Sequence, residues 1–85
     1  DKFPDYPTYP KGAQNALLDM EFNMGGKFTK NKWPKFFEAV QNKDWSRAAH
    51  ESHRDQVDDR RNKKTFDWLF DAWREDRRQK EQGGE

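Results

Sequence analysis

Carboxylate side chains in apolar surroundings are the first candidates for chemistry in this sequence. Glu21 lies between Met20 and Phe22, and Asp19 precedes it by two positions. A carboxyl group in an apolar environment can keep its proton near neutral pH and serve as a general acid. Because residues two positions apart project from different faces of a helix, Asp19 and Glu21 would not act as a pair. We therefore interpret Glu21 as an ordinary charge at the edge of a buried helix.

His50 and His53 could support a different chemistry, metal binding. Their spacing of three positions places both on one face of a helix, and imidazole is a common zinc ligand. A third ligand is not evident in the sequence around them. Since the chain also contains no cysteine, disulfides and thiolate metal sites are excluded. We predict neither a bound metal nor a cofactor.

The composition restricts the kinds of partner. The chain of 85 residues has 17 basic and 16 acidic residues and a net charge of +1, which gives little electrostatic attraction to nucleic acid. No apolar run approaches the roughly 18 residues of a membrane-spanning helix. We therefore expect no nucleic-acid partner and no membrane span.

Aromatic residues provide most of the predicted core. Hydrophobic residues make up 31% of the chain and charged residues 39%, a balance that by itself favours disorder. Against this, the seven Phe, four Trp and two Tyr carry large apolar surfaces that a solvated linker would not need. We expect one compact domain with a thin aromatic core and a heavily charged exterior.

Helical spacing of apolar residues predicts an all-α fold, a small bundle of about four helices. The first helix should cover residues 10–24. Its apolar residues recur at intervals of three and four: Ala13, Ala16, Leu17, Met20 and Met24. Leu18 and Phe22 should widen this stripe, so that the helix is buried over more than one face. Gly25 and Gly26 should end it, since glycine can adopt the left-handed cap geometry.

Three further helices are predicted from the same spacing. One should cover residues 33–42, and the next should begin at the cap residue Asp44 and reach residue 53. The last should run from about residue 58 to residue 80 with one buried stripe. That stripe consists of Phe66, Leu69, Phe70 and Trp73.

The helical body should occupy residues 11–74, between two segments of different character. Residues 1–10 contain three prolines, which disfavour helix in the residue before each, so we expect an extended lead-in pinned by its aromatic side chains. Residues 75–85 are almost entirely charged or polar. We expect this segment to be a charged tail that frays.

An ordered set of motifs runs through residues 13–62. It begins with Ala-Leu-Leu-x-Met-x-Phe-x-Met-Gly at residues 16–25 and continues with a turn containing Phe28. Trp-x-x-Ala-Ala at residues 45–49 and Arg-Asn at residues 61–62 follow in that order. Together these motifs resemble the C-terminal lobe of the phage-type lysozymes, the muramidases of glycoside hydrolase family 24, which include pesticin-like toxin domains.

The resemblance implies a two-lobed enzyme that hydrolyses the β-1,4 bond between N-acetylmuramic acid and N-acetylglucosamine. In that family a small N-terminal lobe carries the catalytic glutamate and its partner aspartate, and the helical C-terminal lobe forms the opposite wall of the cleft. The chain matches only that wall, so it would bind substrate, with the catalytic residues in an upstream lobe of the same protein. Its other partners would be peptidoglycan glycan strands and an immunity or inhibitor protein. The enzyme would act on the bacterial cell wall after phage lysis, secretion or delivery within a larger effector.

Phe22 and Asn23 match the family's positions at which the cleft wall meets the sugar. The resemblance implies that Phe22 offers an apolar face to a pyranose ring and that Asn23 bonds the acetamido group. The alternative is that Phe22 belongs to the core and that Asn23 is simply a polar residue at a helix end.

Four further positions complete the implied substrate-binding set. Glu51 and Arg54 match a Glu-Ser-x-Arg motif of pesticin-like relatives, which looks like a polar cluster lining the cleft; an internal salt bridge between Glu51 and an arginine is the alternative. Arg61 and Asn62 match the family's Arg-Asn at the start of the final helix, where an arginine would reach the peptide-stem carboxylates of peptidoglycan. Alternatively, Arg60 and Arg61 are solvated and bond the preceding loop.

Two functions of other classes remain open from the sequence. The missing catalytic acid and the four tryptophans are compatible with a stand-alone carbohydrate-binding or regulatory module. The charged fourth helix is compatible with a helical protein-interaction adaptor.

Overall fold

The computed structural model of the chain describes residues 2–55 and 57–83, and in this part of the chain it contains helices and no strand. The prediction of a small all-α bundle is confirmed. Its four α-helices are α1 at Lys11–Met24, α2 at Pro34–Gln41, α3 at Trp45–Glu51 and α4 at Asp59–Gly83. None of these helices is long and apolar enough to cross a membrane.

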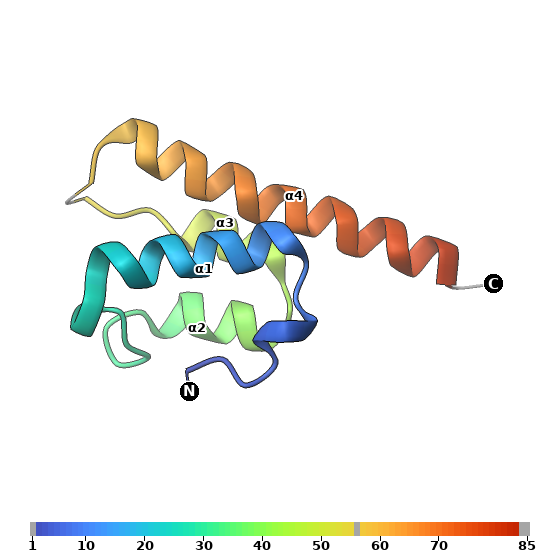
Figure 1. Cartoon of the computed structure of the whole chain (residues 1–85), viewed down its shortest axis with the longest axis horizontal. Helices are drawn as coiled ribbons and strands as arrows, with labels where there is room; N and C mark the ends of the chain where they lie inside the picture. The colour runs from blue at the N-terminus through green and yellow to red at the C-terminus, as the bar shows by residue number, and fades with distance from the viewer. Residues whose placement is uncertain (1, 56, 84–85) are drawn as a thin grey trace.

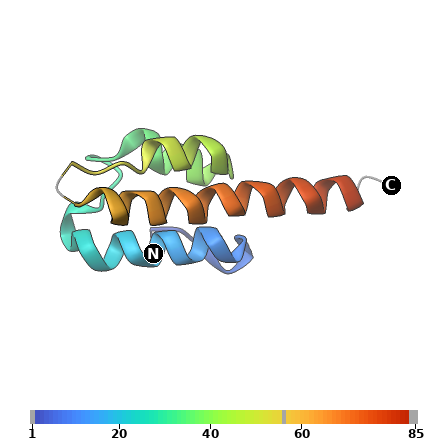
Figure 2. The ribbon, with the colours of Figure 1, turned by 90° about the horizontal axis from the view of Figure 1, so that it is seen from above.

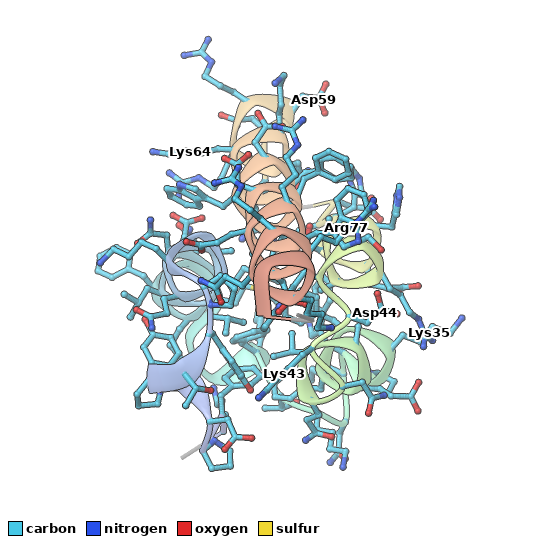
Figure 3. All side chains as sticks on the ribbon, turned by 90° about the vertical axis from the view of Figure 1, so that its right-hand side faces the viewer. Lys35, Lys43, Asp44, Asp59, Lys64 and Arg77 are labelled. Atoms are coloured by element: carbon cyan, nitrogen blue, oxygen red, sulfur yellow. The ribbon has the colours of Figure 1, made fainter. Side chains whose placement is uncertain are left out.

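Helix α4 is the central element of the bundle. It packs against α1 on one side and α3 on the other, and α3 packs in turn against α2 (Figure 1, Figure 2). The last turns of α4 project beyond the other helices (Figure 1). Viewed along α4, Lys64 extends on the side of α1 and Arg77 on the side of α3 (Figure 3).

One face of α1 is buried and the other is not. The buried residues have the predicted spacing and are Ala13, Ala16, Leu17 and Met20. The prediction that Leu18 and Phe22 widen this stripe is wrong, because these residues are 60% and 91% exposed. Successive residues of a helix are rotated by about 100°, so Leu18 turns away from the surface against which Leu17 packs.

Small residues allow α1 and α4 to approach each other closely. A Cβ atom on Gly12 would lie 2.3 Å from the backbone carbonyl oxygen of Trp68. The residues of α4 that are fully buried include Thr65 and Ala72. Short side chains therefore occupy the surface where the two helix backbones meet.

The aromatic side chains of α4 lie at the flank of this contact. Of the predicted stripe, Leu69 is fully buried, but Phe66, Phe70 and Trp73 are only half-buried, so the prediction is right for Leu69 alone. The three rings stack in succession, with centroid distances of 5.9 Å and 5.2 Å. The guanidinium of Arg74 lies 4.9 Å from the centroid of Phe70. The ring of Phe70 is thus partly covered by a basic side chain.

The shorter helices start and end close to the predicted positions. The side chain of Asp44 accepts a hydrogen bond from the N–H of Arg47 at 3.3 Å, which confirms the predicted cap of α3. Helix α3 ends at Glu51, two residues earlier than predicted, and α2 begins at Pro34. Trp33 precedes α2 and is only half-buried, in contrast to the fully buried Phe36, Phe37 and Val40.

Phe3 and Tyr9 anchor the N-terminal segment. Phe3 stacks on Phe37 at 4.9 Å, and Tyr9 meets Trp45 edge-on at 4.9 Å, so the prediction that aromatic residues pin this segment is confirmed. The segment is not fully extended, since Tyr6–Thr8 forms a turn of 3-10 helix. At the other end, most of the predicted tail is helical. Residue 1 and residues 84–85 of the two predicted segments lie outside the described residues.

Candidate functional site

The last turn of α1 places Phe22 and Asn23 at the surface. Gly25 ends the helix with a φ of +54°, in the region that favours glycine, and its N–H donates to the carbonyl of Glu21. Because Phe22 is exposed, the interpretation of its ring as a core side chain is wrong. Asn23 is exposed too; its Nδ2 donates to the carbonyl of Asp19 at 2.7 Å, while its Oδ1 accepts no hydrogen bond from the described residues. Neighbouring residues thus offer solvent an apolar ring and an amide oxygen.

Arg54 is the buried charge of this region. It is 2% exposed, and its Nη2 donates to Oγ1 of Thr65 on α4 at 2.7 Å. Its Nε and Nη1 are buried and donate to no described residue. Burial lowers the pKa of Arg54, the charge of Asp19 opposes this shift, and the charge of Arg61 adds to it. Unpaired N–H groups are costly in a protein interior, so an additional acceptor near Arg54 would be stabilising.

Asn62 ties the segment after α3 to the start of α4. Its Oδ1 accepts a hydrogen bond from the backbone N–H of Arg54 at 3.0 Å, and its Nδ2 donates to the carbonyl of Arg54 at 2.8 Å. Asn62 is itself buried. The resemblance implied a substrate-binding role, but here the side-chain amide holds the backbone of Arg54. We name this pair the Arg54–Asn62 clamp.

Asp19 connects the exposed end of α1 to α4. Its Oδ1 lies 3.4 Å from Nη1 of Arg61, and its Oδ2 lies 3.5 Å from Oγ1 of Thr65. The Arg61 side chain remains 44% exposed and keeps N–H groups available to a ligand. The backbone N–H of Arg61 donates to the side chain of Asp58 at 2.8 Å. Arg61 therefore contacts the preceding loop through its main chain, as the alternative interpretation proposed, whereas its guanidinium pairs with Asp19. The sequence analysis did not identify Asp19 and Thr65 as site residues. Asp19 could have been found, because a carboxylate within an otherwise apolar helix indicates that it has a partner.

Glu51 does not join this cluster. It is half-buried and forms no ion pair with a residue of the described ranges, so the alternative interpretation of a salt bridge with an arginine is wrong. Glu51 borders a pocket of about 350 Å³ together with Lys32 and Trp33. Arg54 borders a different pocket, although Lys32 and Trp33 contribute to both.

The pocket beside Arg54 also includes Asn23 and has a volume of about 510 Å³. Lys27 and Lys32 add two cationic side chains to its border. We name it the basic pocket. Its apolar border consists of Met24, Trp33 and Val57. Lys27 and Lys32 were also missed from the sequence, because charged loop residues give no signal until the fold brings them together.

The other candidates from the sequence have partners elsewhere. Glu21 forms an ion pair with Lys2 at 2.8 Å, and His53 lies 3.3 Å from Asp55. His50 packs edge-on against an aromatic ring of α4. Among the residues that the structure describes, no group of three histidine, cysteine or acidic side chains could hold a metal ion.

Comparison with known proteins assigns no family. The chain matches no protein-family model, no curated protein and no solved structure. The features that indicate a function are those of the surface. That surface combines the exposed ring of Phe22, the amide of Asn23 and the basic pocket.

Proposed function

We propose that the chain is the substrate-binding lobe of a peptidoglycan-hydrolysing muramidase. It holds the glycan strand, while a catalytic acid in an upstream lobe of the same protein cleaves the bond between N-acetylmuramic acid and N-acetylglucosamine at the bacterial cell wall. The observation that carries this proposal is the exposed ring of Phe22 next to Asn23, within a helix motif that resembles that of the phage-type lysozymes.

Phe22 has the properties of a platform for a sugar ring. Leaving it 91% exposed forgoes the roughly 2 kcal/mol that burial of a phenyl ring contributes, and the whole ring is available to a ligand that could recover this free energy. The C–H face of a pyranose ring is apolar and can cover the phenyl group. The neighbouring Asn23 offers Oδ1 as an acceptor for the N–H of an acetamido group.

The two carboxylates of α1 favour a binding role over a catalytic one. Glycoside hydrolysis requires a carboxylic acid in an apolar site and a second carboxylate about 5–9.5 Å away. Glu21 is half exposed and paired with Lys2, and Asp19 is paired with Arg61. The proposal therefore assigns the proton donor to another segment of the protein.

Binding to purified sacculi tests the proposal directly. The chain should co-sediment with sacculi, and Phe22→Ala should weaken this binding roughly tenfold, as expected for the loss of one well-placed aromatic contact. Leu18→Ala is the matched control, since it removes another exposed apolar side chain one turn earlier on the same helix. Equal binding by the Phe22→Ala variant and the parent chain would refute the role of Phe22.

Cell-wall hydrolysis tests whether this chain binds substrate while another lobe supplies the catalytic acid. A longer protein that includes the upstream residues should clear a suspension of cell walls, whereas the 85-residue chain should not. Cleavage of glycan by the short chain alone would contradict the assignment of the catalytic acid to another segment.

A non-catalytic interaction module is the second candidate, and one observation favours it. Leu18 and Phe22 are exposed one helical turn apart, and Leu18 borders a pocket of about 660 Å³ beside Phe3 and Tyr6. Apolar residues at this spacing are typical of helix faces that dock on other proteins. In that case Leu18→Ala should weaken protein binding as strongly as Phe22→Ala does, and neither variant should alter binding to sacculi.

A further inference from the structure

The basic pocket differs in charge from other pockets of this protein. Its charged border residues are Lys27, Lys32 and Arg54, and no carboxylate borders it. Pockets elsewhere on the described surface include acidic side chains such as Glu21 and Glu51. A concave site lined by one sign of charge and by apolar walls concentrates the opposite charge, so this pocket should attract anions.

The cationic groups of the basic pocket lack partners within the protein. Neither Lys27 nor Lys32 forms a side-chain ion pair with any residue of 2–55 or 57–83. Lys63, by contrast, is paired with an acidic side chain one helical turn away at 2.8 Å. Nε and Nη1 of Arg54 are likewise without an acceptor there. Asp19, whose negative charge raises the pKa of Arg54, already forms an ion pair with Arg61.

The apolar border of the pocket indicates the size of the ligand. Met24, Trp33 and Val57 offer hydrophobic surface next to the cations, and the volume of about 510 Å³ accommodates more than a single small anion. A ligand that satisfies both features carries carboxylates on an aliphatic framework. Short acidic peptides have this chemistry, whereas inorganic phosphate would leave the apolar border uncovered.

We propose that the basic pocket binds the carboxylates of a short acidic peptide. Lys27 and Lys32 contact the carboxylates at the pocket border, and the buried charge of Arg54 adds to the attraction. The identification of this peptide as the stem that peptidoglycan carries beside its glycan strand rests on the proposed function. The preference for carboxylates does not, because it follows from the charge of the pocket.

Calorimetric titration of the full chain tests the inference with four probes. These are the disaccharide of N-acetylglucosamine and N-acetylmuramic acid with an acidic tetrapeptide stem, the same compound with its stem carboxylates amidated, the disaccharide with its lactyl carboxylate capped as an amide, and the free tetrapeptide. The acidic stem compound should bind at least about tenfold more tightly than the amidated one, the effect of losing charge-assisted hydrogen bonds. Higher salt should reduce this difference, since partly exposed charges are screened.

Variants of the lysines test whether the preference for the acidic stem compound arises in the basic pocket. A Lys27→Gln/Lys32→Gln double variant should lose the preference for the acidic stem and bind the disaccharide like the parent chain. Lys30→Gln is the matched control, because Lys30 is an exposed lysine of the same loop that does not border the pocket. These exposed lysines are preferable to Arg54, whose replacement in the interior would also disturb folding.

The outcomes separate this inference from the proposed function. Equal affinity for the acidic and amidated compounds, or equal effects of the double variant and Lys30→Gln, would overturn the inference. Binding of the acidic tetrapeptide that depends on Lys27 and Lys32, together with no binding of the disaccharide, would support the pocket assignment and count against a glycan-binding lobe. Binding of the disaccharide that depends on Phe22, together with equal affinity for the acidic and amidated compounds, would support the lobe alone and overturn the pocket assignment.

Discussion

Replacing Asn62 by alanine should destabilise the protein strongly, because it removes the Arg54–Asn62 clamp. The Asn62 amide makes hydrogen bonds of 3.0 Å and 2.8 Å to the backbone N–H and carbonyl of Arg54. Both residues are buried, so water does not readily replace the lost partners. Leaving a buried polar group unpaired costs about 1–3 kcal/mol, and two such groups are left here, which gives a loss of roughly 2–6 kcal/mol.

This loss is large for a domain of this size. Native stability amounts to about 0.05–0.15 kcal/mol per residue, which corresponds to roughly 4–13 kcal/mol for the whole chain. Urea unfolding followed by tryptophan fluorescence should show the decrease as a lower midpoint with an unchanged slope. Asn31→Ala is the matched control, since Asn31 is exposed and its side chain makes no hydrogen bond within the described residues. The control should change stability by less than about 0.5 kcal/mol.

A small effect of Asn62→Ala, within the range of the control, would refute the reasoning. It would mean that the Arg54 backbone finds other partners, or that the clamp does not hold the segment after α3. A variant with full stability but weakened binding to sacculi would indicate that Asn62 contacts the ligand, as the resemblance to the lysozymes implies.

Three further predictions concern packing and backbone strain, and urea unfolding measures each of them. Phe22→Ala should lower the unfolding free energy by less than about 0.5 kcal/mol, whereas the buried Phe36→Ala should lower it by about 3–5 kcal/mol; similar losses would contradict the surface position of Phe22. Gly12→Ala should lower the unfolding free energy by about 1–3 kcal/mol, because the new Cβ would lie 2.3 Å from the α4 backbone. Gly26→Ala, where a Cβ meets open space, should leave the unfolding free energy unchanged or raise it. An unchanged stability of Gly12→Ala would show that the two helices can move apart. Lys43→Gly should raise the unfolding free energy by roughly 0.5–1 kcal/mol, because Lys43 has a φ of 58°, a left-handed conformation that glycine adopts more easily. A lower unfolding free energy would mean that the lysine side chain makes a contact that compensates for the strain.

Local signals in the sequence were sufficient to predict the helices. Gly25 ends α1 and Asp44 caps α3, because both effects depend on backbone geometry within one helical turn. The exposed positions of Phe22 and Asn23 follow from the neighbouring helices instead. Periodicity could not show which apolar side of α1 the rest of the fold covers, since apolar residues occur on both sides: Leu17 is buried, whereas Leu18 and Phe22 are exposed.

The site itself could be predicted only in part, because its contacts join distant segments. The motif resemblance pointed to Arg54, Asn62 and Arg61 as substrate-binding residues. It did not indicate that the side chain of Asn62 bonds the backbone of Arg54, which depends on the approach of two segments. Asp19 meets Arg61 across 42 positions of sequence. No local pattern encodes such a contact.

The sequence by itself determined that this chain forms helices, where they end to within about three residues, and which residues are apolar enough to be buried. Only the tertiary structure decided which apolar side chains stay in water and which charges stay unpaired. The physical reason is that burial and pairing depend on the neighbours that other helices supply. The close contact of α1 with α4 selects short side chains such as Thr65 and Ala72, while Phe22 stays exposed. The fold also brings the end of α1, the loop before α2 and the segment after α3 together around the basic pocket.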